Sequence, residues 1–162
     1  MRNERRLTPF EHYMLADERP GYPMRFCFRL VFDGSLDLPR LNQAFALAKV
    51  DHPLLIAHVE RDTGCLTWMM SPPPTQGREW AWAFDLTKET GIRFLLEQRK
   101  DDCTLWLQVH HSCTDARGAI QFLANWFAYY DGSETPPPES SAEDLASKMR
   151  QRDIGRDRRL WT

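Results

Sequence analysis

The sequence predicts an α+β fold for a chain of 162 residues. Two observations lead to this prediction. Short segments alternate apolar and polar residues, as β-strands do, and two longer segments repeat apolar residues at helical spacing. The length is sufficient for one compact domain with its own core. Hydrophobic residues make up 42% of the chain and charged residues 27%, the composition of an ordinary soluble globular protein.

Composition also excludes several classes of protein. Uninterrupted apolar stretches, such as residues 68–70, are far shorter than the roughly 20 residues of a membrane span. A net charge of -2 argues against a dedicated nucleic-acid binder. The first residues lack the apolar segment of a secretory signal. Because the four cysteines are irregularly spaced, we expect reduced thiols in a cytoplasmic protein. They are Cys27, Cys65, Cys103 and Cys113.

The clearest strand is predicted over residues 25–33, where aromatic and polar residues alternate with a period of two. One face carries Phe26, Phe28, Leu30 and Phe32. The opposite face carries Arg25, Cys27, Arg29 and Val31. Such alternation indicates a strand with one buried face, which the turn residues Asp33-Gly34-Ser35 bring to an end.

A helix follows from Asp37, which can cap it, to about Val50. Pro39 is tolerated because it falls in the first turn. Pro53 requires a stop before it, since the residue preceding a proline avoids the helical region. The predicted inward stripe consists of Leu41, Phe45 and Ala48.

Four further segments are predicted to be strands in two pairs, 54–60 with 65–70 and 92–99 with 104–110. Residues 61–64 between the first two strands have the composition of a hairpin turn. The polar residues 100–102 join the second pair. Three prolines within residues 71–75 predict a loop, because proline cannot join the interior of a sheet.

The last predicted core element is a helix over residues 116–130, ended by Asp131-Gly132. Its inward face is predicted to hold Ile120, Leu123, Phe127 and Tyr130. We therefore assign residues 1–132 to one lobe, and 133–162 to a proline-rich linker and a basic connector helix. The basic tail is interpreted as a solvated helix face, with nucleic-acid or anionic-lipid binding as the alternative.

The segment whose residues could take part in catalysis is an apolar strand that ends in His110 and His111. A short loop then leads to Asp115. Adjacent strand residues point to opposite faces, so the two histidines cannot act on one substrate atom unless the strand bends. A histidine at a strand end facing a cleft can act as a general base, because its ordinary pKa of about 6.5 suits proton transfer near neutral pH. Asp115 can pin the loop through a salt bridge.

The residue types alone leave other interpretations open. The histidine pair can be purely structural. A metal site would need His110, His111, Cys113 and Asp115, but neighbouring strand ligands diverge and no second cluster has zinc spacing, so no metal is expected. A nucleophilic Ser112 or Cys113 would need a base nearby, and the G-x-S-x-G context is missing.

His110-His111-x-x-x-Asp115 followed by Ala116 resembles the His-His-x-x-x-Asp-Gly motif of the chloramphenicol acetyltransferase-like superfamily. That group includes condensation domains of nonribosomal peptide synthetases and wax ester synthases. Flanking segments occur in the family's order over residues 7–132. They are Thr8–Leu15, Asp33-Gly34, Leu36-Asp37, Asp51–Leu55, Phe84-Asp85-Leu86 and Gly91–Phe94.

This resemblance implies an α/β sandwich lobe in which helices flank a mixed, mostly antiparallel sheet. It implies that His111 is the general base for a hydroxyl or amine that attacks an acyl thioester. His110 would pack or hydrogen-bond behind the site, and Asp115 would pair with an arginine. No tightly bound cofactor is expected; the donor substrate would be acyl-coenzyme A or an acyl-phosphopantetheine on a carrier protein.

Two residues depart from the family pattern. Ala116 replaces the motif glycine and lacks its access to positive φ, so the turn must differ unless Gly118 supplies the freedom. Condensation domains usually carry an arginine where this chain has Ile56. We therefore expect Arg29 to pair with Asp115, with Arg117 as the weaker alternative.

The length is also a departure, because condensation-type enzymes contain two similar lobes with the channel between them. The chain corresponds to the N-terminal lobe, so we expect an incomplete acyltransferase. A missing C-terminal lobe or an oligomer neighbour would complete the channel, and an acyl carrier protein is a possible partner. The alternative is a catalytically degenerate lobe that binds a carrier protein or a subunit. A zinc-dependent hydrolase is the third class considered.

Overall fold

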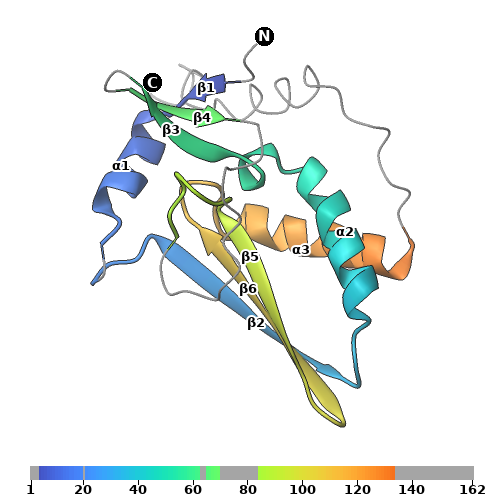
Figure 1. The fold of residues 1–162 in the computed structure, drawn as a ribbon. Helices are drawn as coiled ribbons and strands as arrows, with labels where there is room; N and C mark the ends of the chain where they lie inside the picture. The colour runs from blue at the N-terminus through green and yellow to red at the C-terminus, as the bar shows by residue number, and fades with distance from the viewer. Residues whose placement is uncertain (1–3, 20, 63–64, 70–83, 134–162) are drawn as a thin grey trace, which may run out of the picture.

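The computed structural model describes residues 4–19, 21–62, 65–69 and 84–133 (Figure 1). Within them the chain forms two three-stranded antiparallel sheets and three α-helices, which confirms the predicted α+β fold. The larger sheet has the strand order β2-β6-β5, and the smaller has the order β1-β4-β3. None of the helices described is long and apolar enough to cross a membrane.

The larger sheet is built on the pairing of β2 (Arg25–Asp33) with β6 (Asp102–His110). Nine residue pairs form this ladder, from Arg25 opposite His110 to Asp33 opposite Asp102. The third strand, β5 (Ile92–Gln98), pairs with the other edge of β6. The alternation predicted for β2 is confirmed: its even-numbered residues pack against the core, whereas Cys27, Arg29 and Val31 are exposed.

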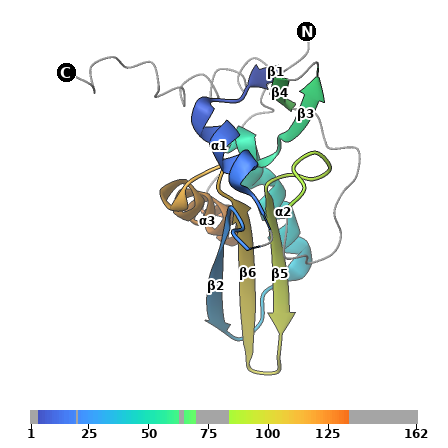
Figure 2. The ribbon, with the colours of Figure 1, turned by 90° about the vertical axis from the view of Figure 1, so that its left-hand side faces the viewer.

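Two helices, α2 (Leu38–Val50) and α3 (Ala116–Asp131), cover one face of this sheet (Figure 2). Helix α2 buries the predicted Leu41, Phe45 and Ala48, together with Ala44. Helix α3 buries Ala119, Phe122, Leu123 and Trp126. The two helices are joined by a buried hydrogen bond of 3.0 Å from Trp126 Nε1 to the Leu41 carbonyl.

The predicted face of α3 was partly wrong. Ile120 is 56% exposed, and Phe127 and Tyr130 are only partly buried. The side of α3 that packs against the core is instead the one that carries Trp126, which contacts α2. Ile120 lies outside this side. The largest aromatic side chain therefore sets the orientation of α3, since it contributes the most buried apolar area.

The strand predicted over residues 54–60 was also wrong at both ends. Pro53–Leu55 forms a 3-10 turn, and strand β3 runs from His58 to Asp62. Leu54 and Leu55 are buried in the core from that turn, so their apolar character reflects burial rather than strand structure. The prediction that α2 stops before Pro53 is confirmed, since α2 ends at Val50.

The smaller sheet lies above the larger one at the end where β6 finishes (Figure 1). It consists of β1 (Glu4–Arg6), β4 (Cys65–Met69) and β3, with Asp62 paired to Cys65. The predicted strand 65–70 is confirmed to within one residue. The whole of the predicted loop 71–75 lies outside the described residues, as do the turn residues 63–64 and all of the linker and connector helix 133–162 except residue 133.

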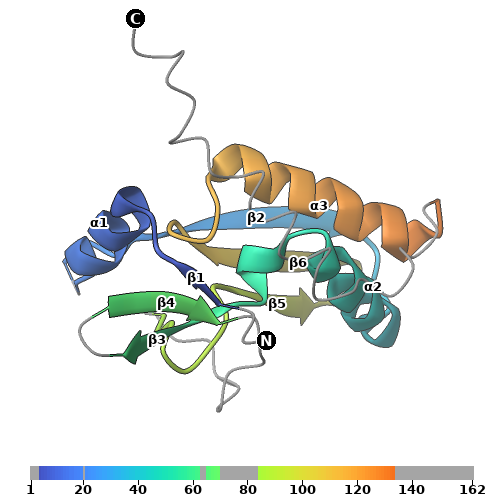
Figure 3. The same cartoon turned by 90° about the horizontal axis from the view of Figure 1, so that it is seen from above.

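Helix α1 (Pro9–Asp17) lies at the same end of the larger sheet (Figures 2 and 3). A capping box begins it: the Thr8 N–H donates to Glu11 Oε2 at 2.7 Å, and Thr8 Oγ1 accepts from the Glu11 N–H at 3.3 Å. Arg5 of β1 forms an ion pair with Glu11. The small sheet and α1 are thus tied together next to the end of β6.

The N-terminal cap of α2 provides a test of the fold. Asp37 Oδ1 accepts a hydrogen bond of 2.7 Å from the Arg40 N–H, so Asp37→Ala leaves that donor without its cap. We expect Asp37→Ala to lower the free energy of unfolding by about 1 kcal/mol, measured by urea denaturation. Asp37→Ser, which retains an acceptor oxygen, should retain most of the stability; equal losses in the two variants would contradict the capping role.

Candidate active site at the end of β6

His110, the last residue of β6, is 1% exposed and is hydrogen-bonded on both sides of its ring. Its Nε2 lies 3.2 Å from Glu18 Oε2. Its Nδ1 accepts from the Ser112 N–H at 3.1 Å and lies 2.7 Å from Ser112 Oγ. Glu18 also accepts a hydrogen bond of 2.6 Å from the Met24 N–H, so the carboxylate is held in place.

These contacts determine the protonation state of His110. A backbone N–H can only donate, so Nδ1 must be the acceptor and the ring proton sits on Nε2, facing Glu18. Burial, followed by the neighbouring His111, lowers the pKa of His110 from 6.5 to about 4. The edge of the Phe84 ring packs against it with centroids 6.0 Å apart. His110 is therefore a neutral imidazole at neutral pH.

His111 lies in a different environment, because the backbone turns directly after His110. The Cys113 N–H donates to the His110 carbonyl at 3.0 Å, and the His111 N–H donates to the Met24 carbonyl at 2.7 Å. The His111 ring is partly exposed and meets the Phe26 ring edge to face at 5.2 Å. Its Nδ1 is buried and has no hydrogen-bond partner in the described part of the chain.

The two histidines therefore diverge, with His110 at the end of β6 and His111 in the turn that follows it. His110 points toward Glu18 and Ser112, whereas His111 contacts Phe26, whose side chain packs against the core. His111 is the one of the pair that combines partial exposure with an unpaired ring nitrogen. Buried polar atoms without a partner are rare in native proteins and concentrate where a ligand or a catalytic role explains them.

Asp115 begins helix α3 instead of pairing with an arginine. Its Oδ1 accepts a hydrogen bond of 2.7 Å from the Gly118 N–H, as an N-cap. Arg29 lies over the ring of Trp106 at 5.5 Å, on the face of the sheet opposite α3. The expected pair of Asp115 with Arg29 or Arg117 is thus absent among the described ion pairs. Arg29 is excluded from it because the pleat of β2 directs its side chain away from α3.

The expectation about Ala116 is corrected as well. Ala116 is the first residue of α3, where the backbone is right-handed helical. Of the described glycines, Gly34 and Gly132 alone have positive φ, so Gly118 supplies no unusual freedom. Alanine at this position therefore needs no positive φ. Ile56 follows the 3-10 turn as its C-terminal cap residue.

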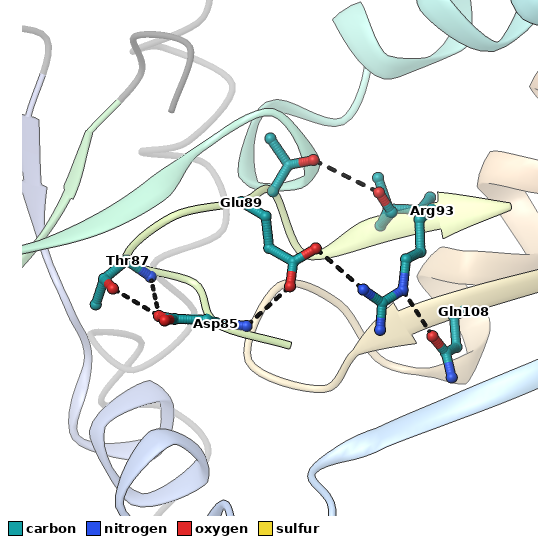
Figure 4. Close-up of polar contacts among 7 residues, drawn as sticks. Asp85, Thr87, Glu89, Arg93 and Gln108 are labelled. Carbon is teal, nitrogen blue, oxygen red and sulfur yellow. Dashed lines mark hydrogen bonds and ion pairs between the residues drawn. The ribbon is translucent and has the colours of Figure 1, made fainter. Parts of the chain in front are cut away.

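The segment Phe84–Gly91 packs behind the histidines and was not predicted to be part of the site. The Gly91 carbonyl accepts the His110 N–H at 2.8 Å. A Cβ atom at Gly91 would overlap Cys113 Sγ. The backbone can therefore pass this close to Cys113 only because residue 91 is a glycine. Figure 4 shows the polar contacts of the segment, in which Glu89 joins the Asp85 backbone to Arg93, and Arg93 joins Gln108.

Sequence reasoning did not identify Glu18, Arg93 or Gln108, and it considered Ser112 only as a nucleophile and not as a partner of His110. Glu18 and Ser112 are the hydrogen-bond partners of His110. One signal was available for Gln108, because it stands two residues before His110 and therefore shares its face of the strand. Glu18 gave no signal, since its contact with His110 joins distant segments of the chain.

A hollow of about 420 Å³ lies on the face of the larger sheet opposite α2 and α3. Its lining residues are Pro23, Arg25, Phe26, Cys27, Leu95, Glu97, Trp106 and Gln108. His111 is not in this wall, although Phe26, which His111 contacts, is. In the described ranges, no group of three histidine, cysteine or carboxylate residues is arranged to hold a metal ion.

No family model matches the sequence, and no curated protein sequence matches it. Solved structures do match. The X-domain in its complex with OxyB from teicoplanin biosynthesis superimposes over 90% of this chain, with a TM-score of 0.69 and 19% identity. The starter condensation domain of rhizomide synthetase RzmA covers 91% of it, with a TM-score of 0.68 and 14% identity.

Polyketide synthase associated protein 5 from Mycobacterium tuberculosis covers 84% of the chain, with a TM-score of 0.57 and 20% identity. The chain spans 38%, 43% and 35%, respectively, of these three structures. It therefore has the fold of a condensation-domain lobe, as the sequence resemblance implied, and corresponds to about two fifths of such structures.

The close approach of Gly91 and Cys113 predicts a coupled effect on stability. Gly91→Ala should lower the free energy of unfolding by about 1–3 kcal/mol, because the added methyl group overlaps Cys113 Sγ. Cys113→Ala in the same chain removes that atom and should recover part of the loss, as a double-mutant cycle in urea would show. Gly21→Ala is the matched control, since its Cβ meets nothing within 4 Å; strict additivity would contradict the overlap.

The lowered pKa of His110 predicts a dependence of stability on pH. The folded pKa of about 4 lies below the ordinary value of 6.5, so the unfolded chain takes up a proton first as the pH falls. This contribution is complete above about pH 6.5 and is lost progressively toward pH 4. We expect His110→Gln to lose about 2 kcal/mol less stability than the parent between pH 7 and pH 5 in urea unfolding. Identical losses would show that His110 titrates normally.

Proposed function

We propose that this chain is the N-terminal, histidine-bearing lobe of a thioester-dependent acyltransferase of the condensation-domain type. It would transfer an acyl group from coenzyme A or from a carrier protein to a hydroxyl or an amine, with His111 as the general base. The observation that supports this proposal most directly is the contrast within the histidine pair. Both ring nitrogens of His110 have partners and the ring is buried, whereas His111 is partly exposed and its Nδ1 has no hydrogen-bond partner among the described residues.

In the proposed step, His111 removes the proton of the acceptor hydroxyl or amine through a ring nitrogen. The acceptor oxygen or nitrogen attacks the thioester carbonyl carbon, and the tetrahedral intermediate expels the thiolate. The imidazolium of His111 returns the proton to that thiolate, so the base is regenerated. The acyl thioester is a substrate in this scheme, and no tightly bound cofactor is needed.

The neutral state of His110 serves this chemistry. The charges of two adjacent histidines oppose each other, as the lowering of the His110 pKa by His111 shows. Burial keeps His110 neutral, and its contacts with Glu18 and Ser112 hold the tautomer in which Nε2 carries the proton.

The proposal includes a partner, because the chain corresponds to about two fifths of the matching structures. A second lobe or an oligomer neighbour would supply the opposite wall of the channel, and a carrier protein would deliver the donor in the cytoplasm. The X-domain, which has this fold, was solved in complex with OxyB, so the fold is compatible with partner binding. Without catalysis, the same surfaces would make a binding module.

The base is tested by His111→Ala in the full protein that carries this chain. We expect acyl transfer from acyl-coenzyme A or an acyl-carrier protein to fall about 10²–10⁴-fold, because a positioned general base contributes about that much. His12→Gln, an exposed histidine of α1, is the matched control and should leave the rate unchanged. If the parent binds an acyl-carrier protein but neither protein transfers the acyl group, the lobe is a binding module.

A further inference from the structure

Arg93 of β5 contacts separate parts of the chain, and Figure 4 shows its polar contacts with Gln108 and Glu89. Its Nε donates to Gln108 Oε1 of β6 at 2.8 Å. Its Nη1 lies 3.1 Å from Glu89 Oε2. Its guanidinium also lies 4.2 Å from the centroid of the Phe84 ring. The side chains of Arg93 and Glu89 are only 14% and 15% exposed, so this pair is shielded from water far better than a surface salt bridge.

The contacts of Arg93 fasten the segment Phe84–Gly91 against the sheet. Glu89, which receives the guanidinium, also accepts the Asp85 N–H at 2.9 Å. The Asp85 carbonyl in turn accepts the Lys88 and Glu89 N–H groups at 2.8 and 2.9 Å. The segment is therefore a closed turn with an internal framework, and Arg93 connects that framework to the strand that carries His110.

Both ends of the same segment touch the histidine site. At one end the Phe84 ring packs edge to face on His110. At the other end the Gly91 carbonyl accepts the His110 N–H at 2.8 Å, and Gly91 closes on Cys113. The backbone turn from His110 to Cys113 includes His111, so a displacement of the segment would displace the proposed base.

We propose that Arg93 is a positioning residue, which holds the segment Phe84–Gly91 against Gln108 and thereby fixes the histidine turn at the end of β6. Arg93 itself contacts Gln108, Glu89 and Phe84, and it acts on the histidines through them. A guanidinium suits this task because its planar fork can serve two acceptors and stack on a ring at the same time. The relevance of this role to catalysis rests on the proposed function of His111; the structural role does not.

The test uses nuclear magnetic resonance on the full chain, with the parent, Arg93→Met and Asp37→Ala compared at one pH. In Arg93→Met the ring signals of His110 should shift, because the ring current of Phe84 acts on them and depends on its position. The His110 amide should also exchange with solvent at least about 10-fold faster, since its bond to Gly91 is loosened. Asp37→Ala, the cap variant of α2, should leave the His110 ring signals in place.

A purely stabilising role for Arg93 would give a different result. Arg93→Met and Asp37→Ala would then change the His110 signals alike, in proportion to the stability they lose, and this outcome would overturn the proposal. If Arg93→Met does not fold, Arg93→Lys and Glu89→Gln carry the comparison. Lysine keeps the charge but not the planar fork, so we expect the His110 ring signals to shift from their positions in the parent. Unchanged His110 signals in both Arg93→Lys and Glu89→Gln would also overturn the proposal.

The result of the NMR test on Arg93 can be distinguished from the result of the activity test on His111. An undiminished rate in His111→Ala would refute the assignment of the base and leave the NMR result on Arg93 standing. Conversely, unchanged His110 signals in the Arg93 variants would refute the positioning role and leave the His111 assay untouched.

Discussion

The register between β2 and β6 is the constraint on which the rest of this lobe depends. Nine residue pairs hold the two strands together, and this alignment places every second side chain of β2 on the face that α2 and α3 cover. A slip of one residue would exchange Phe26 and Phe28 for Cys27 and Arg29 on that face. The same register sets Arg25 opposite His110. The register of β2 with β6 therefore determines both which side chains enter the core and which residue lies beside His110.

Local patterns predicted the fold where burial on one face decides the structure. The alternation of β2 and the cap at Asp37 are visible in the sequence because neighbouring residues produce them. Sequence patterns did not predict the structure correctly where a contact with a distant part of the chain determines it. Leu54 and Leu55 are apolar because the core surrounds their turn, and Ile120 is exposed because the contact of Trp126 with α2 sets the rotation of α3.

The candidate site divides in the same way. The two histidines diverge because β6 ends at His110 and the backbone turns at His111, whereas the sequence predicted divergence from strand alternation alone. The helix cap by Asp115 was overlooked, although an aspartate just before a predicted helix is a recognised start signal. Apart from the nearby Ser112, the partners of His110 were beyond prediction, because Glu18 and the segment around Gly91 reach it from distant parts of the chain. Tertiary contacts of this kind, rather than the motif itself, distinguish the two imidazoles.

The order of the strands in the larger sheet has a consequence for synthesis of the protein. Strand β2 is made early, but its partner β6 follows only after residues 34–101. Until β6 emerges, a strand with four large apolar side chains has no ladder to join, whereas β5 and β6 form a hairpin with each other almost at once. A nascent chain of this lobe therefore exposes an aggregation-prone segment while residues 34–101 are made, and the pairing of β2 with β6 is a late, long-range step in folding.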